Sequence, residues 1–344
     1  MIEIDGGEKS GSGTILRLSI ALASILNEEL HIYNIRKKRD NPGLRPQHLE
    51  AVLTAAKLVN AEVKGAYLGS KELWFKPGTI KGGNFESEIG TAGSIPMLFM
   101  TVLPICIFSK DKVNLTVKKG GTDVRASPTI NYLKNIMLRV LGKIGVEANV
   151  EVKRYGYYPV GGGEATLTVE PSSTLQPIIL DEFGNVKELR GISVCTYLRD
   201  RKVSERQASA ALKELRAKGL EAKIDIIYDE SNPLQKGSSI VLWCESDKEA
   251  ILGSDSIGEI GKSSEVVGIE AARKLVSEIE SRVTVDVHMA DMLIPYVALS
   301  KGESTFTVRE VSDHLETNIW LCEKILGVSF SIKKVDGRFK VTKT

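Results

Sequence analysis

Pro46-Gln47-His48-Leu49-Glu50-Ala51 and Ser312-Asp313-His314-Leu315-Glu316-Thr317 begin two matching amphipathic runs in this chain. Laid over each other without a gap, the runs also end alike, with Ala61-Glu62-Val63 falling on Gly327-Val328-Ser329. Each run then continues into two short strand-like stretches. The match predicts a fold built from repeats, with a histidine placed twice at the start of a helix. Exposed backbone N–H groups and the helix dipole favour anions there, phosphate included.

Hydrophobic periodicity extends this unit to three copies, each predicted as helix, strand, helix and two strands. The first copy places helices at 14–25 and 48–59 and strands at 30–35, 62–65 and 72–75. The second places helices at 94–108 and 129–144 and strands at 113–117, 147–153 and 164–169. The third places helices at 292–299 and 315–326 and strands at 304–308, 329–333 and 338–341. The copies share little identity, so the repeat is inferred from pattern.

Roughly a hundred residues between the second and third copies do not fit the unit, which is enough for a small domain. This stretch follows the Pro171-Ser172-Ser173 break and predicts strands at 191–197, 222–228 and 239–245, with helices at 205–218 and 263–279. We therefore predict an α+β protein. Residues 1–175 and 283–344 form a large domain of three repeats, and residues 176–282 form a smaller α/β domain inserted before the third repeat.

The composition is that of an ordinary globular protein, with 42% hydrophobic and 26% charged residues among 344. A net charge of +2 is too small to indicate nucleic-acid binding unless the cations cluster locally. The four cysteines are scattered without metal-ligand spacing, which predicts buried thiols in a reducing compartment. Met1–Asp5 lacks a basic signal segment, and the longest apolar run, 95–108, contains two prolines and is too short to span a bilayer. We predict a soluble cytoplasmic protein with no membrane partner.

The glycine-rich segment 6–14 precedes a helix and invites comparison with phosphate-binding loops. It lacks the Gly-Lys-Ser/Thr of a Walker A loop, because Ser12 follows Gly11, and it lacks the third glycine of the dinucleotide fingerprint, because Leu16 stands there. A glycine turn into a helix start, suited to close approach of an anion, remains. A plain turn is the equally supported alternative.

The segment 34–48 places several cations in a loop broken by proline and glycine, directly before the helix that His48 begins. Arginine presents a planar fork that matches phosphate oxygens, so this loop is predicted to clamp phosphate. The alternative is a solvated basic loop; the adjacent Gln47, His48 and helix start favour the functional interpretation.

The other histidines have weaker signals. His288 and Asp291 are one helical turn apart, a spacing compatible with metal binding, although a structural or nucleotide-facing polar pair is the better interpretation without further ligands. His31 lies in a predicted strand and is interpreted as structural. A neutral imidazole at His314 could attack phosphorus and form a covalent intermediate, whereas a helix-start histidine is often only a cap.

Motifs spread in order over essentially the whole chain resemble the RNA 3'-terminal phosphate cyclase family. They are Arg36-x-x-Arg39, Pro42-Gly43-Leu44-Arg45-Pro46-Gln47-His48-Leu49, Thr91-Ala92-Gly93-Ser94, Gly120-Gly121-Thr122-Asp123, Tyr157-Tyr158-Pro159-x-Gly161-Gly162-Gly163, His288-x-Ala290-Asp291 and His314-Leu315-x-Thr317-Asn318. The resemblance implies the three βαβαββ-type repeats and the insertion already predicted.

The resemblance also implies a ligase-like reaction. ATP adenylylates a histidine, which by motif is His314, and releases pyrophosphate. AMP then passes to an RNA 3'-phosphate, giving RNA(3')pp(5')A, and the vicinal 2'-OH closes a 2',3'-cyclic phosphate. The implied co-substrate and metal are ATP and Mg²⁺ or Mn²⁺, and the implied partner is an RNA 3'-phosphate end. The subunit number stays open, with a homodimer as one option.

Carried over by motif, the residues fall into two sets besides the catalytic His314. The set implied for ATP comprises Met100, His288, Met289, Ala290, Asp291 and Met292. The set implied for phosphate and RNA comprises Arg17, Arg36, Arg39, Gln47 and His48.

The chain departs from the family pattern at a few positions. Ser10 stands where many members carry a metal-associated glutamate, so no metal ligands are assigned, although Glu8 is close in sequence or the ATP phosphates could hold Mg²⁺. Thr14, Met100 and Met292 stand at positions that are usually glutamine, and His288 at an aromatic position.

Two other functions are considered. A non-catalytic cyclase-like RNA-binding factor of ribosomal RNA maturation is one, but that branch lacks the histidine retained here as His314. An enolpyruvyl-transferase-type enzyme is the other, and its substrate motifs are not evident.

Overall fold

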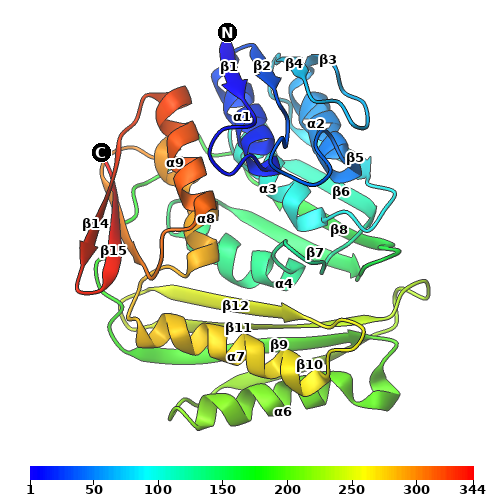
Figure 1. Ribbon diagram of the computed structural model, residues 1–344, viewed down its shortest axis with the longest axis vertical. Helices are drawn as coiled ribbons and strands as arrows, with labels where there is room; N and C mark the ends of the chain where they lie inside the picture. Colours follow the sequence, from blue (N-terminus) through cyan, green and yellow to red (C-terminus); the bar gives the residue numbers. More distant parts are fainter.

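The computed structural model describes residues 1–344 (Figure 1). It contains three small sheets whose strands follow one another in a common order. The first unit runs through β1 (Ile2–Asp5), α1 (Gly13–Leu26), β2 (Leu30–Tyr33), α2 (Pro46–Val59), β3 (Glu62–Lys64) and β4 (Leu73–Lys76). Its sheet order is β1-β2-β4-β3, with β1 parallel to β2 and the other pairs antiparallel.

The second and third units repeat this topology. The second comprises β5 (Gly83–Glu88), α3 (Ile95–Ile107), β6 (Val113–Gly120), α4 (Ile130–Tyr132), the π-helical segment η1 (Leu133–Met137), α5 (Leu138–Gly142), β7 (Ala148–Arg154) and β8 (Gly163–Val169), in the order β5-β6-β8-β7. The third comprises α8 (Val287–Leu299), β13 (Ser304–Val308), α9 (Asp313–Leu326), β14 (Phe330–Val335) and β15 (Arg338–Lys343), in the order β13-β15-β14. Ile179 bridges in parallel to Thr305, so the chain before the insertion occupies the place of the third unit's first strand.

The predicted α+β class and the threefold repeat are confirmed by this strand pairing. The predicted single helix at 129–144 is instead divided into α4, η1 and α5. Ile136, in η1, packs against Gly253 of the inserted sheet. The contact is close, because a Cβ atom at position 253 would lie 2.6 Å from Ile136 Cγ1. Packing between the two parts of the chain therefore accompanies the local departure from α-helical geometry.

The inserted part forms one four-stranded sheet covered by two helices. It comprises β9 (Val186–Thr196), the 3₁₀ segment η2 (Arg199–Arg201), α6 (Val203–Arg216), β10 (Lys223–Asp229), β11 (Gly237–Ser246), β12 (Ile251–Ile257) and α7 (Ser264–Glu280). The strand order is β10-β9-β11-β12, and α6 and α7 cover one face (Figure 1). This face and its helices share a cluster of 15 buried apolar residues.

The opposite face of the inserted sheet packs into the main core. The main cluster of 70 buried residues includes Val194, Val241, Trp243 and Ile251 from the inserted sheet beside the helices of the repeats. The predicted domain limits at 175/176 and 282/283 stay a prediction, but the two parts share apolar packing. The four cysteines are buried and unpaired, as predicted. None of the helices combines the length and apolar character needed to cross a membrane.

Candidate active site

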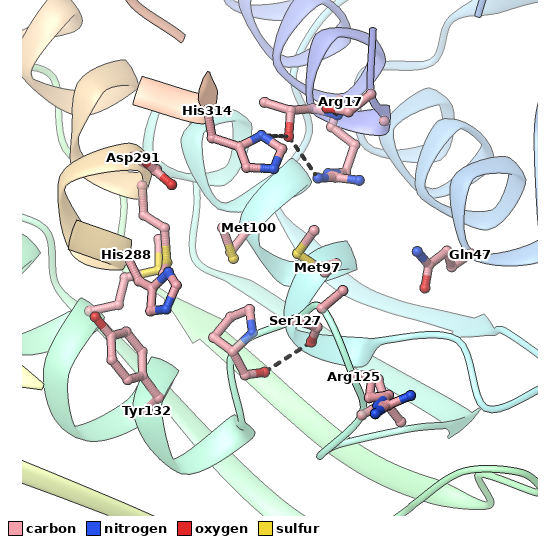
Figure 2. A pocket seen from close by; sticks show the side chains of 18 of the residues that line it. Arg17, Gln47, Met97, Met100, Arg125, Ser127, Tyr132, His288, Asp291 and His314 are labelled. Atoms are coloured by element: carbon pink, nitrogen blue, oxygen red, sulfur yellow. Dashed lines mark hydrogen bonds between the residues drawn. The ribbon is translucent and has the colours of Figure 1, made fainter. Parts of the chain in front are cut away.

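A cavity of about 680 Å³ lies where the repeats meet the inserted sheet. The N-terminal ends of α1, α2 and α9 supply lining residues to it, so three sets of exposed backbone N–H groups and three positive helix ends converge there. Figure 2 shows His314 and Arg17 at one end, Ser127 and Arg125 at the other, and Met97 and Met100 between them. This convergence favours an elongated ligand with negative charge.

His314 lies in the first turn of α9, behind the N-cap Ser312. Its Nδ1 lies 3.4 Å from Thr14 Oγ1, which also accepts a hydrogen bond of 3.2 Å from Arg17 (Figure 2). Burial, followed by repulsion from Arg17 and Arg39, lowers the pKa of His314 below its usual value. The ring is therefore neutral near pH 7. In the tautomer that donates Nδ1–H to Thr14, Nε2 keeps its lone pair free.

Four arginines around the cavity have no protein counterion. Arg17, Arg36, Arg39 and Arg45 have no carboxylate within 4.0 Å, and the first three line the cavity. Burial and repulsion from Arg36 and Arg39 lower the pKa of Arg17 to about 10, so it stays cationic at neutral pH. Positive charge held without a counterion is a binding site for an anion, and guanidinium forks fit phosphate oxygens.

His48 differs from His314 although both begin matching helices. It is only 5% exposed, and burial followed by repulsion from Arg17 lowers its pKa to about 2, so its ring is neutral. Its Nδ1 is buried without a hydrogen-bond partner. A Cβ atom at Gly13 would lie 2.4 Å from His48 Nε2. The last glycine of the 6–14 segment thus makes room for the His48 ring, a role that the sequence did not reveal.

Gln47 connects the start of α2 with the start of α3. Its Oε1 accepts a hydrogen bond of 2.9 Å from the backbone N–H of Ser94, the N-cap of α3. The side-chain amide N–H groups of Gln47 remain available to a ligand in the cavity that it lines.

The residues predicted to bind ATP divide into two groups. Met100, His288, Asp291 and Met292 line the cavity, whereas Met289 and Ala290 are fully buried and do not. The helical period of α8 explains the division, because it places 288, 291 and 292 on the cavity side of the helix and 289 and 290 on the core side. Asp291 accepts a hydrogen bond of 2.5 Å from Ser312, and burial raises its pKa to about 6.

The lining residues that were not predicted come from both parts of the chain. Those of the repeats include Arg125 and Tyr132, and those of the inserted part include Asp255, Glu259, Lys262, Glu270 and Lys274. Arg125 forms an ion pair of 2.7 Å with Glu259, and Asp255 accepts a 2.8 Å hydrogen bond from the backbone of Thr129. These contacts join residues more than a hundred positions apart, and no motif in the sequence signals them.

The residues present do not form a protein-held metal site. No group of three or more His, Cys, Asp or Glu side chains is arranged around a common point. Ser10, where the resemblance implied a glutamate in many family members, hydrogen-bonds Ser12 through its hydroxyl and Thr317 through its backbone N–H. Three of the four acidic residues lining the cavity, Asp255, Glu259 and Glu270, are engaged by basic groups or backbone N–H groups.

Comparison with known proteins gives the same family from a family model and from individual relatives. The family model described as RNA 3'-terminal phosphate cyclase matches residues 8–332. An RNA 3'-terminal phosphate cyclase of Pyrobaculum aerophilum is 45% identical over 340 residues, covering 99% of this chain and 97% of the relative. Proteins of the same name from Pyrococcus furiosus and Methanosarcina mazei are 44% identical over 333 residues and 40% identical over 360 residues. They cover 97% and 99% of this chain, and 95% and 99% of their own lengths.

Proposed function

The chain belongs to the RNA 3'-terminal phosphate cyclase family of enzymes, and from this premise we propose that it converts an RNA 3'-phosphate to a 2',3'-cyclic phosphate at the expense of ATP, through an adenylyl group on His314. One observation carries the proposal. A neutral imidazole, oriented through Nδ1 by Thr14, lies at a helix N-terminus in a cavity rich in unpaired arginines.

In the first step, the Nε2 lone pair of His314 attacks the α-phosphorus of ATP. The N–P bond forms as the bond from that phosphorus to the bridging oxygen breaks, and pyrophosphate leaves. Arg17 and Arg39 neutralise charge on the phosphate oxygens in the transition state, which is the main contribution proteins make to phosphoryl and nucleotidyl transfer. Burial lowers the pKa of His314 most, and the positive charge of Arg17 and Arg39 lowers it further. The same two arginines therefore favour both the neutral nucleophile and the attacked phosphate.

In the second and third steps, AMP moves to the RNA and then leaves. A 3'-phosphate oxygen attacks the adenylyl phosphorus, the bond to His314 breaks, and RNA(3')pp(5')A forms. The vicinal 2'-OH then attacks the RNA phosphorus and expels AMP, and the hydroxyl proton passes to the leaving AMP phosphate or to solvent. Arg36 and Gln47 lie on the same cavity and are suited to hold the RNA phosphate through their N–H groups.

We propose that ATP brings its divalent ion on its own phosphates. The cavity lacks a cluster of metal-ligating side chains, and Mg²⁺ usually keeps several waters and binds mainly through substrate phosphates. No step above is assigned to the ion.

The test is labelling of the purified protein by α-labelled ATP with Mg²⁺ or Mn²⁺, followed by denaturing electrophoresis. We expect an acid-labile label on the wild type, none on His314→Ala, and undiminished label on the matched control His31→Ala, whose ring lies on the far sheet face between Glu3 and Glu72. Cyclisation of a 3'-phosphorylated oligoribonucleotide should be lost in parallel. Labelling and cyclisation retained by His314→Ala would refute the mechanism. No label on the wild type with either metal would favour the non-catalytic RNA-binding function.

A further inference from the structure

Two neighbouring surface loops concentrate the positive charge of the chain. Residues 36–45 and 64–71 together carry seven lysines and arginines and one acidic residue, Asp40. The whole chain has a net charge of only +2, so the remaining residues are net acidic. We call these segments the two-loop surface.

The cations of the two-loop surface are free to bind a partner. Within it, Lys37, Arg39, Arg45, Lys64 and Lys71 are exposed, and no carboxylate lies within 4.0 Å of any of them. Some exposed arginines of the inserted part do have acidic partners, for example Arg206 with Glu265 and Arg273 with Glu214. A local excess of unpaired cations favours a polyanion over a neutral or cationic partner.

An aromatic ring and an aliphatic side chain lie exposed among these cations. Tyr67 is 64% exposed and Leu68 is 60% exposed, at the turn between β3 and β4. Proteins that bind single-stranded nucleic acid combine a basic track for the phosphates with aromatic side chains for the bases. The aromatic component distinguishes this surface from a merely solvated basic loop.

The two loops are fixed to each other and to the cavity. The backbone N–H of Gly69 donates to Leu44 O at 2.8 Å, and that of Leu44 donates to Ser70 O at 2.9 Å. Gly43, with φ +82°, leaves no room for a side chain, since a Cβ atom would lie 2.3 Å from Gly69 O. Arg36 donates to Asn41 O and Gly43 O at 2.5 and 2.8 Å, while Arg36 and Arg39 also line the cavity. The surface therefore continues outward from the candidate active site.

We propose that the two-loop surface binds the single-stranded nucleotides upstream of the RNA 3'-phosphate, with Tyr67 stacking on a base and Lys64 and Lys71 contacting the backbone. This inference rests on the proposed function, which places the terminal phosphate in the cavity. A single strand is favoured over a duplex because stacking on Tyr67 needs an unpaired base, and stacking combined with backbone contacts predicts sequence tolerance.

The test compares Tyr67→Ala and the double variant Lys64→Gln/Lys71→Gln with the wild type. The probes are 3'-phosphorylated oligoribonucleotides of about four and about sixteen nucleotides, lengths chosen because single-strand sites on comparable surfaces span roughly 4–16 nucleotides. Fluorescence anisotropy measures affinity at several salt concentrations, and cyclisation assays measure kcat and KM. Controls are Tyr158→Ala, a 77% exposed tyrosine on another loop, and Lys110→Gln/Lys333→Gln, two exposed unpaired lysines elsewhere.

We expect Tyr67→Ala to weaken binding of the long probe about tenfold, as loss of one stacked base predicts, with little change for the short probe. The lysine double variant should lower the slope of log affinity against log salt by about 1.4, which corresponds to two phosphate contacts. Labelling by ATP and kcat should stay at wild-type values, and the controls should bind normally.

Unchanged affinity of both variants for the long probe would overturn the proposal, as would an equal loss in the controls or equal binding of a fully paired duplex. Binding is measured without turnover. If the wild type fails to label with ATP, the proposed function fails while the anisotropy experiment still decides this inference.

Discussion

At the scale of single residues, cations shape the chemistry of His314. Burial lowers the pKa of His314, and repulsion from Arg17 and Arg39 lowers it further, so the neutral ring is favoured. Protonation of Nε2 would block attack on phosphorus, so the rate of adenylylation should follow the unprotonated fraction. We predict a midpoint of the pH–rate profile below 6.5, the usual histidine pKa. Pre-steady-state labelling between pH 5 and 8 measures it.

Arg39→Gln tests the cause of that shift. Removing a nearby positive charge makes protonation of His314 easier, so the midpoint should move upward, toward the unperturbed value. The rate will fall as well, because Arg39 also lines the cavity; the midpoint is the informative quantity. Lys324→Gln, which removes a cation from the last turn of α9, is the control and should leave the midpoint in place.

Asp123, in the Gly120-Gly121-Thr122-Asp123 motif, predicts a pH effect on stability. It is buried, its pKa is raised to about 7 mainly by burial, and it accepts hydrogen bonds from Ile130 N–H and the Thr122 hydroxyl. An unfolded aspartate titrates near 3.9, so the folded state binds the proton more tightly. The contribution of Asp123 to stability is therefore lost as pH rises from about 4 through 7, with a limiting slope of about 1.4 kcal/mol per pH unit.

Urea unfolding at pH 5.5 and 8.0 measures this effect. The unfolding free energy of the wild type minus that of Asp123→Asn should be smaller at pH 8.0, because asparagine does not titrate. A difference that grows with pH would show that the carboxylate is stabilised in its charged form, contrary to the prediction.

The site could be predicted from sequence only where helix starts and family motifs mark it. His314, His48, Arg36 and Arg39 occupy such positions, and the structure brings them to one cavity, while their roles remain predictions. Met289 and Ala290 belong to the motif that begins at His288, but they face the core. Lys262 and Glu270 could not be found, because their place beside the cavity depends on how the inserted sheet docks on the repeats.

At the scale of elements, the start of α9 couples helix stability to the site. Ser312 caps the helix by accepting from Leu315 N–H at 2.9 Å and donates its hydroxyl to Asp291. We predict that Ser312→Ala lowers the unfolding free energy by about 1 kcal/mol, the usual value of an N-cap, and also slows adenylylation because His314 lies in the first turn. Urea unfolding and ATP labelling measure the two effects.

Ser263→Ala is the matched control for that prediction. Ser263 caps α7 by accepting from Val266 N–H, and its helix carries no predicted catalytic residue. It should lose comparable stability and retain the labelling rate. Equal loss of labelling in both variants would mean that global stability, not the position of α9, limits the reaction.

The elements that sequence reasoning identified are those with a strong apolar face. The helix predicted at 315–326 is observed as Asp313–Leu326, and that at 48–59 as Pro46–Val59. The strand β12 was missed because Ser254 and Ser256 interrupt its apolar pattern, yet both are buried and hydrogen-bonded to α7. The strand β5 was missed because it is an edge strand whose side chains are mostly exposed.

At the scale of the whole molecule, the inserted sheet lies between two apolar layers. One face packs on α6 and α7, and the other contributes Trp243 and Val241 to the main core. Polar contacts reinforce this junction. Tyr132 donates to Asp286, which also accepts from the backbone N–H of Gly253 in β12. A cavity wall built by both parts keeps its shape only while they stay docked.

This shared core predicts cooperative unfolding, and the three tryptophans can report it. Trp74 lies in the first unit, Trp243 in the inserted sheet and Trp320 in α9. In each variant that retains one tryptophan, the urea midpoint from fluorescence should coincide with the midpoint from far-ultraviolet circular dichroism of the same variant, because undocking the inserted sheet exposes apolar side chains of both parts. A Trp243 fluorescence transition at clearly lower urea than the circular dichroism transition of the same variant would indicate an independently unfolding inserted domain.

Asn232→Ala sharpens this test at the junction. Asn232 is fully buried and donates through Nδ2 to Tyr155 O at 2.7 Å and Gly161 O at 2.9 Å, both in the second unit. Its removal leaves two buried carbonyls without these donors and should lower the unfolding free energy by about 2–3 kcal/mol. With a shared core, the unfolding free energy reported by each of the three tryptophans falls by that amount. If only the Trp243 signal shifts, the inserted sheet is held to the repeats by this polar contact and not by apolar packing, and the cavity would open whenever that contact is lost.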